Sequence, residues 1–496
     1  MSRIQNLLLI VLILLAGPVA AADEEQKQMT LTELQKMVLE QQKQLEKQQE
    51  LLEEQSKTIE DQTQAISGLH TKLDQVAQAA GQKAPELTDD ELKLQERLAK
   101  VEEELQKPPD TPENVLTAGD FPGSIRIPGS NMAMKFGGNV RLGITDSLDP
   151  IGSTDRFVSG TIPVGETETG ELFNEGFVIS AKRSRLNWDM RLDSSVGQFR
   201  AFVEGDFAGQ GTGGTDDLRL RHAYGQYNRF ILGQTWTTLM DTAAIPEDVD
   251  FEGLNAQINV RQPELRWVKG LGNNRPFSVG IEDPNASITG GVGISRFPDT
   301  IVVVRKERDW GHLQLGAIVR NIVGIPVDES GVELRGQEDS TFGWGATFSG
   351  NLAMRKWDRR DNFKFQINAG DGLGRYINDL GTVGGFDAAF DPETFELKTI
   401  PVIAAYGAYQ HWWARNPWGL FKAIRSTFVY GYVSVEDLDI LPDTFYHSSQ
   451  RASINWLWSP ITQIDLGMEF LWGSRTNKNR ERGTAKQIQF VATFRF

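Results

Sequence analysis

The chain ends in QIQFVATFRF, residues 487–496, and this stretch decides between a helical and a β-sheet fold. Apolar side chains alternate with polar ones, and only Val491 interrupts the polar series. The apolar series is Ile488, Phe490, Ala492, Phe494 and Phe496. A period of two residues is typical of a strand with one apolar face. We therefore predict a closing β-strand, whose apolar face packs against either a protein core or lipid.

The same alternation begins at residue 131 and continues to the end of the chain. In RSRLNWDMRLD, residues 183–193, apolar Leu186 and Trp188 alternate with charged Arg185 and Asp189. We predict sixteen strands, at 132–145, 177–193, 198–207, 218–227, 229–236, 261–268, 276–283, 299–306, 311–321, 342–350, 361–370, 398–411, 421–434, 446–458, 463–473 and 487–496.

The connections between these strands alternate between long and short. Residues 146–176, 237–260 and 371–397 form long connections, whereas 194–197 and 459–462 form short ones. Outer-membrane barrels have an even number of antiparallel strands, long outer loops and short periplasmic turns. Tryptophans near strand ends also match the aromatic girdle of such barrels. We therefore predict an all-β transmembrane barrel of about sixteen antiparallel strands over residues 131–496, in a bacterial outer membrane.

The first 22 residues have the pattern of a secretory signal peptide. An apolar run from Leu7 to Leu15, too short to span a bilayer, is followed by Ala20 to Ala22. The chain contains no cysteine, which in an exported protein excludes disulfides and thiolate sites. Its net charge of -16 gives no basic footprint, so we expect no nucleic-acid partner.

Residues 31–76 carry apolar and glutamine residues at a spacing of seven, starting from Leu31 and Leu34. This repeat predicts a left-handed α-helical coiled coil, and we assign residues 23–106 to a periplasmic stalk. A Pro-rich linker, residues 107–130, follows it. Two interpretations of the stalk remain: a spacer that oligomerises the chain, or a segment that binds a partner such as the peptidoglycan of the cell wall.

Inward-facing arginines are the candidate pore-lining and substrate-binding residues. Guanidinium groups bind carboxylates through two parallel hydrogen bonds, and rings of arginine favour anions in pores. Inward acids such as Glu204 and Asp206 offer the alternative that the charges only neutralise one another. The arginines placed inward by alternation are Arg141, Arg183, Arg185, Arg191, Arg200, Arg219, Arg221, Arg266 and Arg320, with Arg451 and Arg495.

Two stretches resemble the DcaP-type porin family: MKFGGNVRLGITDSLDP, residues 134–150, and GQTWTTLMD, residues 233–241. The N-terminal coiled coil fits the same family, and the resemblance covers essentially the whole mature chain. The terminal Phe496 on an aromatic strand resembles the assembly signal of bacterial outer-membrane proteins generally. The family resemblance implies a homotrimer of sixteen-stranded barrels with periplasmic helices. It also implies passage of small anionic solutes, dicarboxylates among them.

Porin resemblance further suggests that the third long loop, residues 236–261, folds inward and narrows the pore. Its acids would then face the arginines across a gap, in place of being solvated on an ordinary surface loop. The acids expected at this constriction are Asp241, Glu247, Asp248 and Asp250, with Glu252.

Enzymatic and purely structural roles are the competing classes. His447 with Ser448 and Ser449 is the candidate for a Ser-His pair, but adjacent strand residues point in opposite directions. The other histidines are placed in the stalk (His70), on the outer face (His222) or beside short turns (His312 and His411). No metal-ligand spacing occurs, and GQGTGGT at 209–215 lacks the lysine of a phosphate-binding loop.

We predict a passive outer-membrane channel, embedded in the lipid bilayer, that is not an enzyme and needs no cofactor or metal. The alternative is a barrel that anchors the stalk and links the outer membrane to the cell wall. A barrel hydrolase is the third possibility.

Overall fold

The computed structural model describes residues 117–496 except 166–175, 211–215, 271–274, 355–359 and 414–422. The predicted signal peptide, the stalk and the first part of the linker lie outside these residues. The second part of the linker contributes β1 (Ile125–Arg126), which pairs with the beginning of the first long strand, Ile125 opposite Met134.

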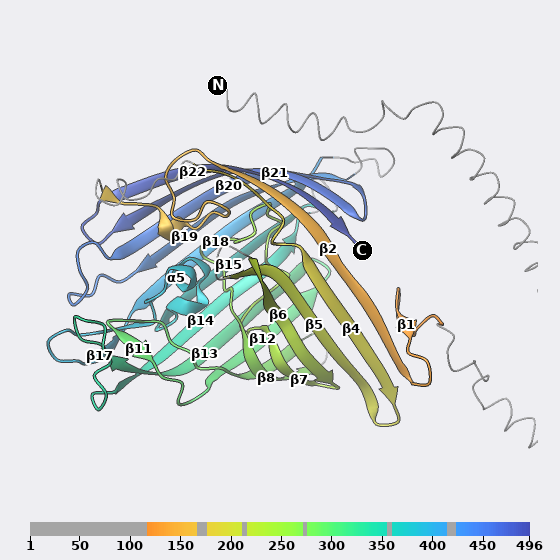
Figure 1. The fold of residues 1–496 in the computed structure, drawn as a ribbon, viewed down its shortest axis with the longest axis horizontal. Coiled ribbons are helices and arrows are strands. Elements are labelled where there is room, and N and C mark those ends of the chain that lie inside the picture. Colours follow the sequence, from red (N-terminus) through yellow and green to blue (C-terminus); the bar gives the residue numbers. More distant parts are fainter. Residues whose placement is uncertain (1–116, 166–175, 211–215, 271–274, 355–359, 414–422) are drawn as a thin grey trace, which may run out of the picture. The chain divides into compact units, whose positions relative to one another are not determined.

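Sixteen antiparallel strands close into a barrel (Figure 1). The last strand pairs with the first, with Val140 opposite Phe494, so the sheet has no free edge there. The barrel strands are β2 (Met132–Ser147), β4 (Arg185–Ser194), β5 (Gly197–Gln210), β6 (Asp216–Tyr227), β7 (Phe230–Trp236), β8 (Arg261–Gly270), β9 (Pro276–Glu282), β12 (Asp299–Arg308), β13 (Gly311–Pro326), β14 (Asp339–Ala353), β15 (Asn362–Asp371), β18 (Pro401–Trp412), β19 (Ile424–Val435), β20 (Tyr446–Ile461), β21 (Ile464–Asn477) and β22 (Arg482–Arg495).

The predicted strand at 177–193 is two strands in the structure. β3 (Phe177–Ser180) and β4 both pair with β2, and residues 181–184 between them leave the ladder as a turn. Within that turn the Ser184 hydroxyl donates to the Ala181 carbonyl at 2.8 Å. Because the turn interrupts the strand, the alternation of inward and outward side chains cannot predict whether Arg183 points into the barrel.

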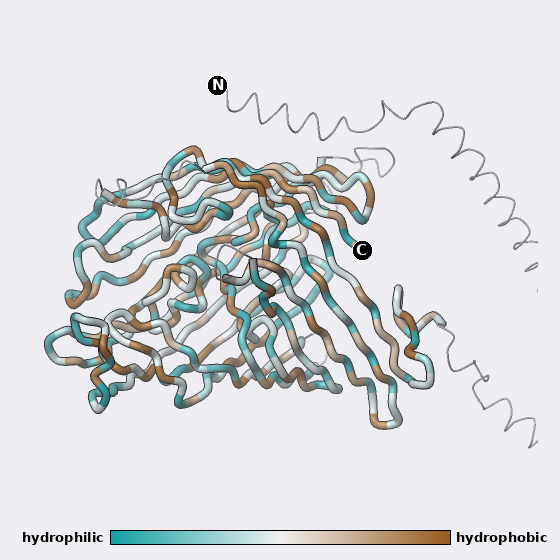
Figure 2. The backbone as a smooth tube through the Cα atoms, viewed as in Figure 1, coloured by the Kyte–Doolittle hydropathy of each residue, from teal (hydrophilic) through white to brown (hydrophobic). Residues whose placement is uncertain are grey.

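Hydrophobic residues recur along the barrel strands (Figure 2), and exposed large hydrophobic side chains form an apolar outer face. On the last three strands, Trp456, Met468, Phe470 and Phe494 are between 39% and 50% exposed. Such a face matches the lipid-facing band of membrane barrels. Val491, which interrupts the polar series of the closing strand, points inward and packs with Val249 and Leu457.

Long connections at one end of the barrel fold into its interior. Residues 372–400 form η3 (Gly374–Tyr376), α5 (Asn378–Val383), β16 (Ala388–Phe390) and β17 (Leu397–Thr399). β16 and β17 form a small sheet with β10 (Ile288–Thr289), beside β11 (Gly291–Gly293), which pairs with β13, and η1 (Ser159–Thr161) lies in the first long loop. Among the described residues, no helix has the length and hydropathy needed to cross a membrane.

The turn between β12 and β13 depends on Gly311. Its φ is +127°, and a Cβ there would clash with the carbonyl oxygen of Asn351 on the neighbouring strand. Replacing Gly311 with alanine should therefore destabilise this end of the barrel by about 1–3 kcal/mol. The matched control is Gly143→Ala, because the added Cβ would meet only the Ser180 carbonyl oxygen, at 3.7 Å. Urea unfolding midpoints measure both effects, and equal midpoints would contradict the strain.

Candidate functional site

The connection between β7 and β8, residues 237–260, runs along the inside of the barrel, and we call it the lumen loop. Its first anchor is Asp241, which lies 2.7 Å from His312 Nε2 and accepts a hydrogen bond from Ser349 at 2.8 Å. Arg305 adds an ion pair at 3.1 Å. The partners stand on β12, β13 and β14, so the loop leaves β7 and crosses the lumen at once.

The middle of the lumen loop is held by β15, β18, β19 and β20. Lys364 donates to the Ile245 carbonyl at 2.7 Å, and the Tyr406 hydroxyl donates to the Ala244 carbonyl at 3.1 Å. Glu247 pairs with Arg425. These bonds satisfy backbone groups that would otherwise be buried without partners.

The far end of the lumen loop is bound to β20 and β21 through buried charges. Glu469 accepts hydrogen bonds from the backbone N–H groups of Val249 and Asp250, both at 2.8 Å. Arg451, whose side chain is fully buried, pairs with Asp250 at 3.0 Å and also donates to the Gly253 carbonyl. Because an unpaired buried charge is costly, this cluster fixes the loop against one wall.

A second long connection, residues 372–400, braces the lumen loop from the side of the long loops. Asn378 donates to the Glu252 and Leu254 carbonyls at 2.9 and 3.1 Å. Asp379 accepts hydrogen bonds from Ser449 and from the Gly160 N–H. Burial raises the pKa of Asp379 above its ordinary value, although these hydrogen bonds oppose the shift.

Three of the predicted constriction acids, Asp248, Asp250 and Glu252, line one cavity together with several of the predicted arginines. Asp241, Glu247 and Asp250 pair with basic residues on the wall that the loop crosses. Asp248 lies 3.8 Å from Arg451 on the same side. Glu252 alone among the five pairs with an arginine of the first long loop, Arg156, at 3.0 Å.

The opposite wall of the lumen carries a cluster of arginines, which we call the arginine wall. Arg141 on β2, Arg185 on β4, Arg219 and Arg221 on β6 and Arg261 on β8 line a cavity of about 670 Å³. The lumen loop supplies the facing side of this cavity. The arginines and the loop therefore leave an open space between them that is accessible to small solutes.

Carboxylates behind the arginine wall hold its guanidinium groups. Asp206, whose side chain is fully buried, pairs with Arg219 at 2.8 Å and Arg221 at 2.7 Å. Glu204 pairs with Arg221 at 3.0 Å and lies 3.8 Å from Arg185. Neither acid lines the cavity, whereas all three arginines do. The acids thus orient the guanidinium groups and leave the positive side toward the space.

A smaller cavity of about 350 Å³ lies toward the end of the barrel with the short turns. It is lined by Arg183, Arg425 and Arg495, with Glu247 and Asp465 among the acids. Four residues contribute to both cavities and mark the boundary between them: Arg141, Arg185, Pro246 and Asp248.

The remaining arginines of the sequence prediction lie elsewhere. Arg191 and Arg200 share Asp189, each at 2.9 Å. Arg266 pairs with Glu264 at 2.8 Å. Arg320 is buried between Asp299 and Asp387, at 3.0 and 2.9 Å. None of these arginines lines either cavity.

The residues of the larger cavity that sequence reasoning missed include three arginines and an aromatic residue: Arg156, Arg261, Arg375 and Phe251. Three of them stand in long loops, where alternation gives no direction. Arg261 is the first residue of β8, directly after the lumen loop. Its guanidinium lies 4.5 Å from the ring centroid of Trp236, and no carboxylate pairs with it among the described residues.

The predicted outward position of His222 is wrong. A bulge between β5 and β6 places Glu204 opposite His222 but Gly205 opposite Leu220, so Arg221 is an extra residue. Both Arg221 and His222 then point inward, and His222 Nδ1 lies 3.0 Å from the Thr235 hydroxyl.

The histidine and serines considered for catalysis are not assembled into a pair. His447 Nδ1 lies 2.8 Å from Asp437, whereas Ser449 donates to Asp379 at 2.7 Å. Within the described ranges, no group of three or more His, Asp and Glu residues could hold a metal ion.

Asp241 provides a pH test of the loop anchor. Burial works against its ionisation, but the hydrogen bond from His312, with Ser349 and Arg305, holds the pKa of Asp241 below its ordinary value. Its stabilising effect is therefore present at neutral pH and is lost as pH falls through this lowered pKa. Asp241→Asn should cost about 1–3 kcal/mol at pH 7. The cost should shrink below a pH of about 4. Urea unfolding of both proteins at pH 7 and below a pH of about 4 measures this cost. The same difference in unfolding free energy at the two pH values would refute the ionic anchor.

Comparison with known proteins places this architecture in a family. Residues 102–496 match the model of the DcaP outer membrane protein family. No sequence among curated proteins matches the chain.

Solved structures resemble this chain to different degrees. The crystal structure of the outer membrane channel DcaP of Acinetobacter baumannii is 19% identical, with a TM-score of 0.63, and the match covers 77% of this chain and 100% of that one. A loop-deletion mutant of OmpT from Vibrio cholerae is 10% identical, with a TM-score of 0.47 and coverage of 74% and 100%. An anion-selective porin from Comamonas acidovorans is 9% identical, with the same TM-score and the same coverage. Because the family model matches most of the chain, the protein belongs to the DcaP outer membrane protein family.

Proposed function

We propose that the protein is a passive outer-membrane channel that favours small anionic solutes, dicarboxylates among them. The observation that carries this proposal is the charge around the larger cavity. Seven arginines and three acids line it: Arg141, Arg156, Arg185, Arg219, Arg221, Arg261 and Arg375, against Asp248, Asp250 and Glu252.

The position of the acids strengthens the anion preference. The Asp250 side chain is fully buried and pairs with Arg451 at 3.0 Å, and Asp248 lies 3.8 Å from the same guanidinium group. Glu252 is neutralised by Arg156. The field in the cavity is therefore dominated by the arginine wall, and guanidinium forks are suited to the two oxygens of a carboxylate. A dicarboxylate can engage two such forks at once, whereas a monocarboxylate can engage only one.

Family membership supports a channel as the general role, because the Acinetobacter relative with the same fold is described as an outer membrane channel. Passage requires that binding remains weak enough for the solute to leave. In this proposal the channel has no energy coupling and no catalytic step.

We also propose that three chains assemble into a homotrimer, with the stalk in the periplasm. The seven-residue repeat of residues 31–76 supports assembly, since a helix with such an apolar stripe needs partner helices. The number of three chains rests on the resemblance to the DcaP-type porin family. Deleting residues 23–106 separates this role from anchoring to peptidoglycan. A channel keeps conducting after the deletion, whereas an anchor loses its attachment to the cell wall.

Arg261 allows the anion preference to be tested without leaving a buried acid unpaired. Arg261→Gln should lower the anion-to-cation permeability ratio by about threefold, because it removes one positive charge from the cavity. The matched control is Arg191→Gln, since Arg191 pairs with Asp189 outside the cavity. Zero-current potentials in planar bilayers under a salt gradient give both ratios. Equal losses in the two variants would argue against a role specific to the cavity.

A further inference from the structure

We propose that Phe251 is a specificity-determining residue of the channel. Its ring orders four guanidinium groups of the lumen, and this order strengthens the binding of small dicarboxylates. The inference rests on the proposed function and adds an aromatic residue to a site otherwise made of charges.

Four arginines surround the ring of Phe251: Arg185, Arg219 and Arg221 of the arginine wall, and Arg183, which lines the smaller cavity. The guanidinium carbon of Arg183 lies 4.4 Å from the ring centroid, and those of Arg185, Arg219 and Arg221 lie 5.6, 5.8 and 5.5 Å away. All four are within the distance at which the negative face of an aromatic ring attracts a cation. Among the described residues, no other ring has four such neighbours.

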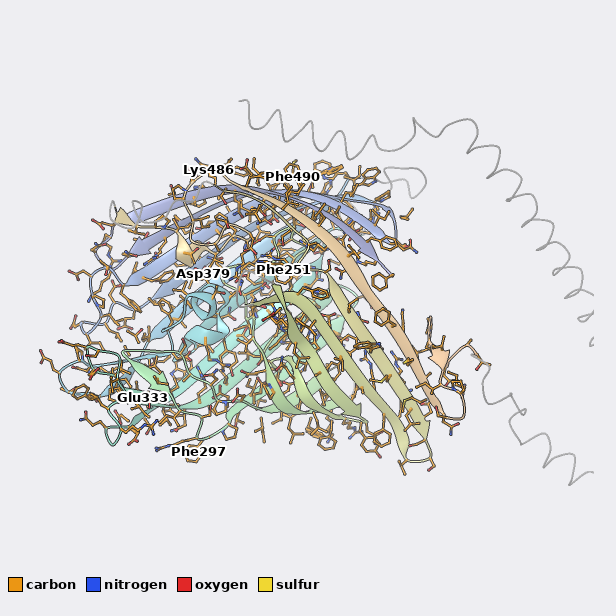
Figure 3. All side chains as sticks on the ribbon, viewed as in Figure 1. Phe251, Phe297, Glu333, Asp379, Lys486 and Phe490 are labelled. Atoms are coloured by element: carbon orange, nitrogen blue, oxygen red, sulfur yellow. The ribbon has the colours of Figure 1, made fainter. Side chains whose placement is uncertain are left out.

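The backbone on both sides of Phe251 is fixed, so the ring cannot swing out of the lumen. Before it, the Asp250 N–H donates to Glu469 and the Asp250 side chain pairs with Arg451. After it, Glu252 pairs with Arg156 and accepts a hydrogen bond from Thr382 at 2.7 Å. Figure 3 shows Phe251 near the middle of the barrel.

The ring counteracts the repulsion among these four guanidinium groups. Four like charges close together repel one another, and unrestrained side chains would spread apart. Glu204 and Asp206 bind Arg221 and Arg219 from behind, and Asp155 binds Arg183 at 3.2 Å. Phe251 contacts the same groups from the lumen side. The guanidinium groups are therefore held between carboxylates and an aromatic face.

This arrangement leaves N–H groups available to a solute while the ring supplies no competing acceptor. A carboxylate in place of Phe251 would neutralise the arginines, and an aliphatic side chain would leave them held only by the carboxylates behind them. Because the side chains are ordered before the anion arrives, less entropy is lost on binding. The ring thereby favours solutes that engage several guanidinium groups at once, as a dicarboxylate does.

The test compares Phe251→Leu with Phe251→Tyr in planar bilayers. Leucine keeps an apolar side chain, although a shorter one, and has no π face, whereas tyrosine keeps the face. Block of the ion current by succinate is the readout, and butyrate, with one carboxylate, is the reference solute. The leucine variant should bind succinate about tenfold more weakly, and the tyrosine variant should stay within about twofold of wild type. Butyrate should be affected much less in both.

Equal succinate block in the leucine variant and in wild type would overturn the proposal and leave Phe251 as a steric element. If the leucine variant does not fold, 3,5-difluorophenylalanine at position 251 weakens the π face at nearly constant size. Unchanged block by succinate there would overturn the proposal equally. Failure of the proposed function gives a different result, because the wild-type protein itself would then show neither anion preference nor succinate block.

Discussion

The structure of the lumen depends on the buried ion cluster that ties the lumen loop to β20 and β21. Glu469 accepts hydrogen bonds from two backbone N–H groups of the loop, and Arg451 donates to Asp250 and to the Gly253 carbonyl. Both side chains are fully buried, so loss of either partner would leave a charge without compensation in the barrel interior. The loop consequently has one energetically acceptable position, against that wall.

The position of the loop determines the character of the pore. Acids of the loop form ion pairs with Arg305, Arg425 and Arg451 on the wall behind it. The arginines of the arginine wall, on β2, β4, β6 and β8, line the open cavity on the other side. Phe251 then projects from the loop into the cluster of guanidinium groups. Loop anchoring, the proposed anion preference and the proposed aromatic ordering all follow from this one position of the loop.

Period-two alternation and loop lengths predicted the barrel and the number of its strands, because each strand has one face toward the lumen and one toward lipid. The same alternation pointed to Arg141, Arg185, Arg219 and Arg221, which line the cavity. It could not separate them from Arg320, which also points inward but is enclosed by the acids of a long loop.

Local departures from regular strand geometry account for the other differences. The bulge at Arg221 reverses the direction of His222, and no residue type near it signals the extra position. The partners of Asp241 and Asp250 come from strands far away in sequence, so their direction depends on the closed barrel as a whole. The importance of Phe251 is visible only when the loop and the arginine wall are placed together.

The most direct test of this account is the zero-current potential of the purified wild-type protein in a planar bilayer under a salt gradient, repeated with a dicarboxylate on one side. A potential of anion-selective sign, with block of the current by the dicarboxylate, is the predicted result. A cation-selective potential without block would contradict the account, because it would mean that the acids of the lumen loop, and not the arginine wall, govern the pore.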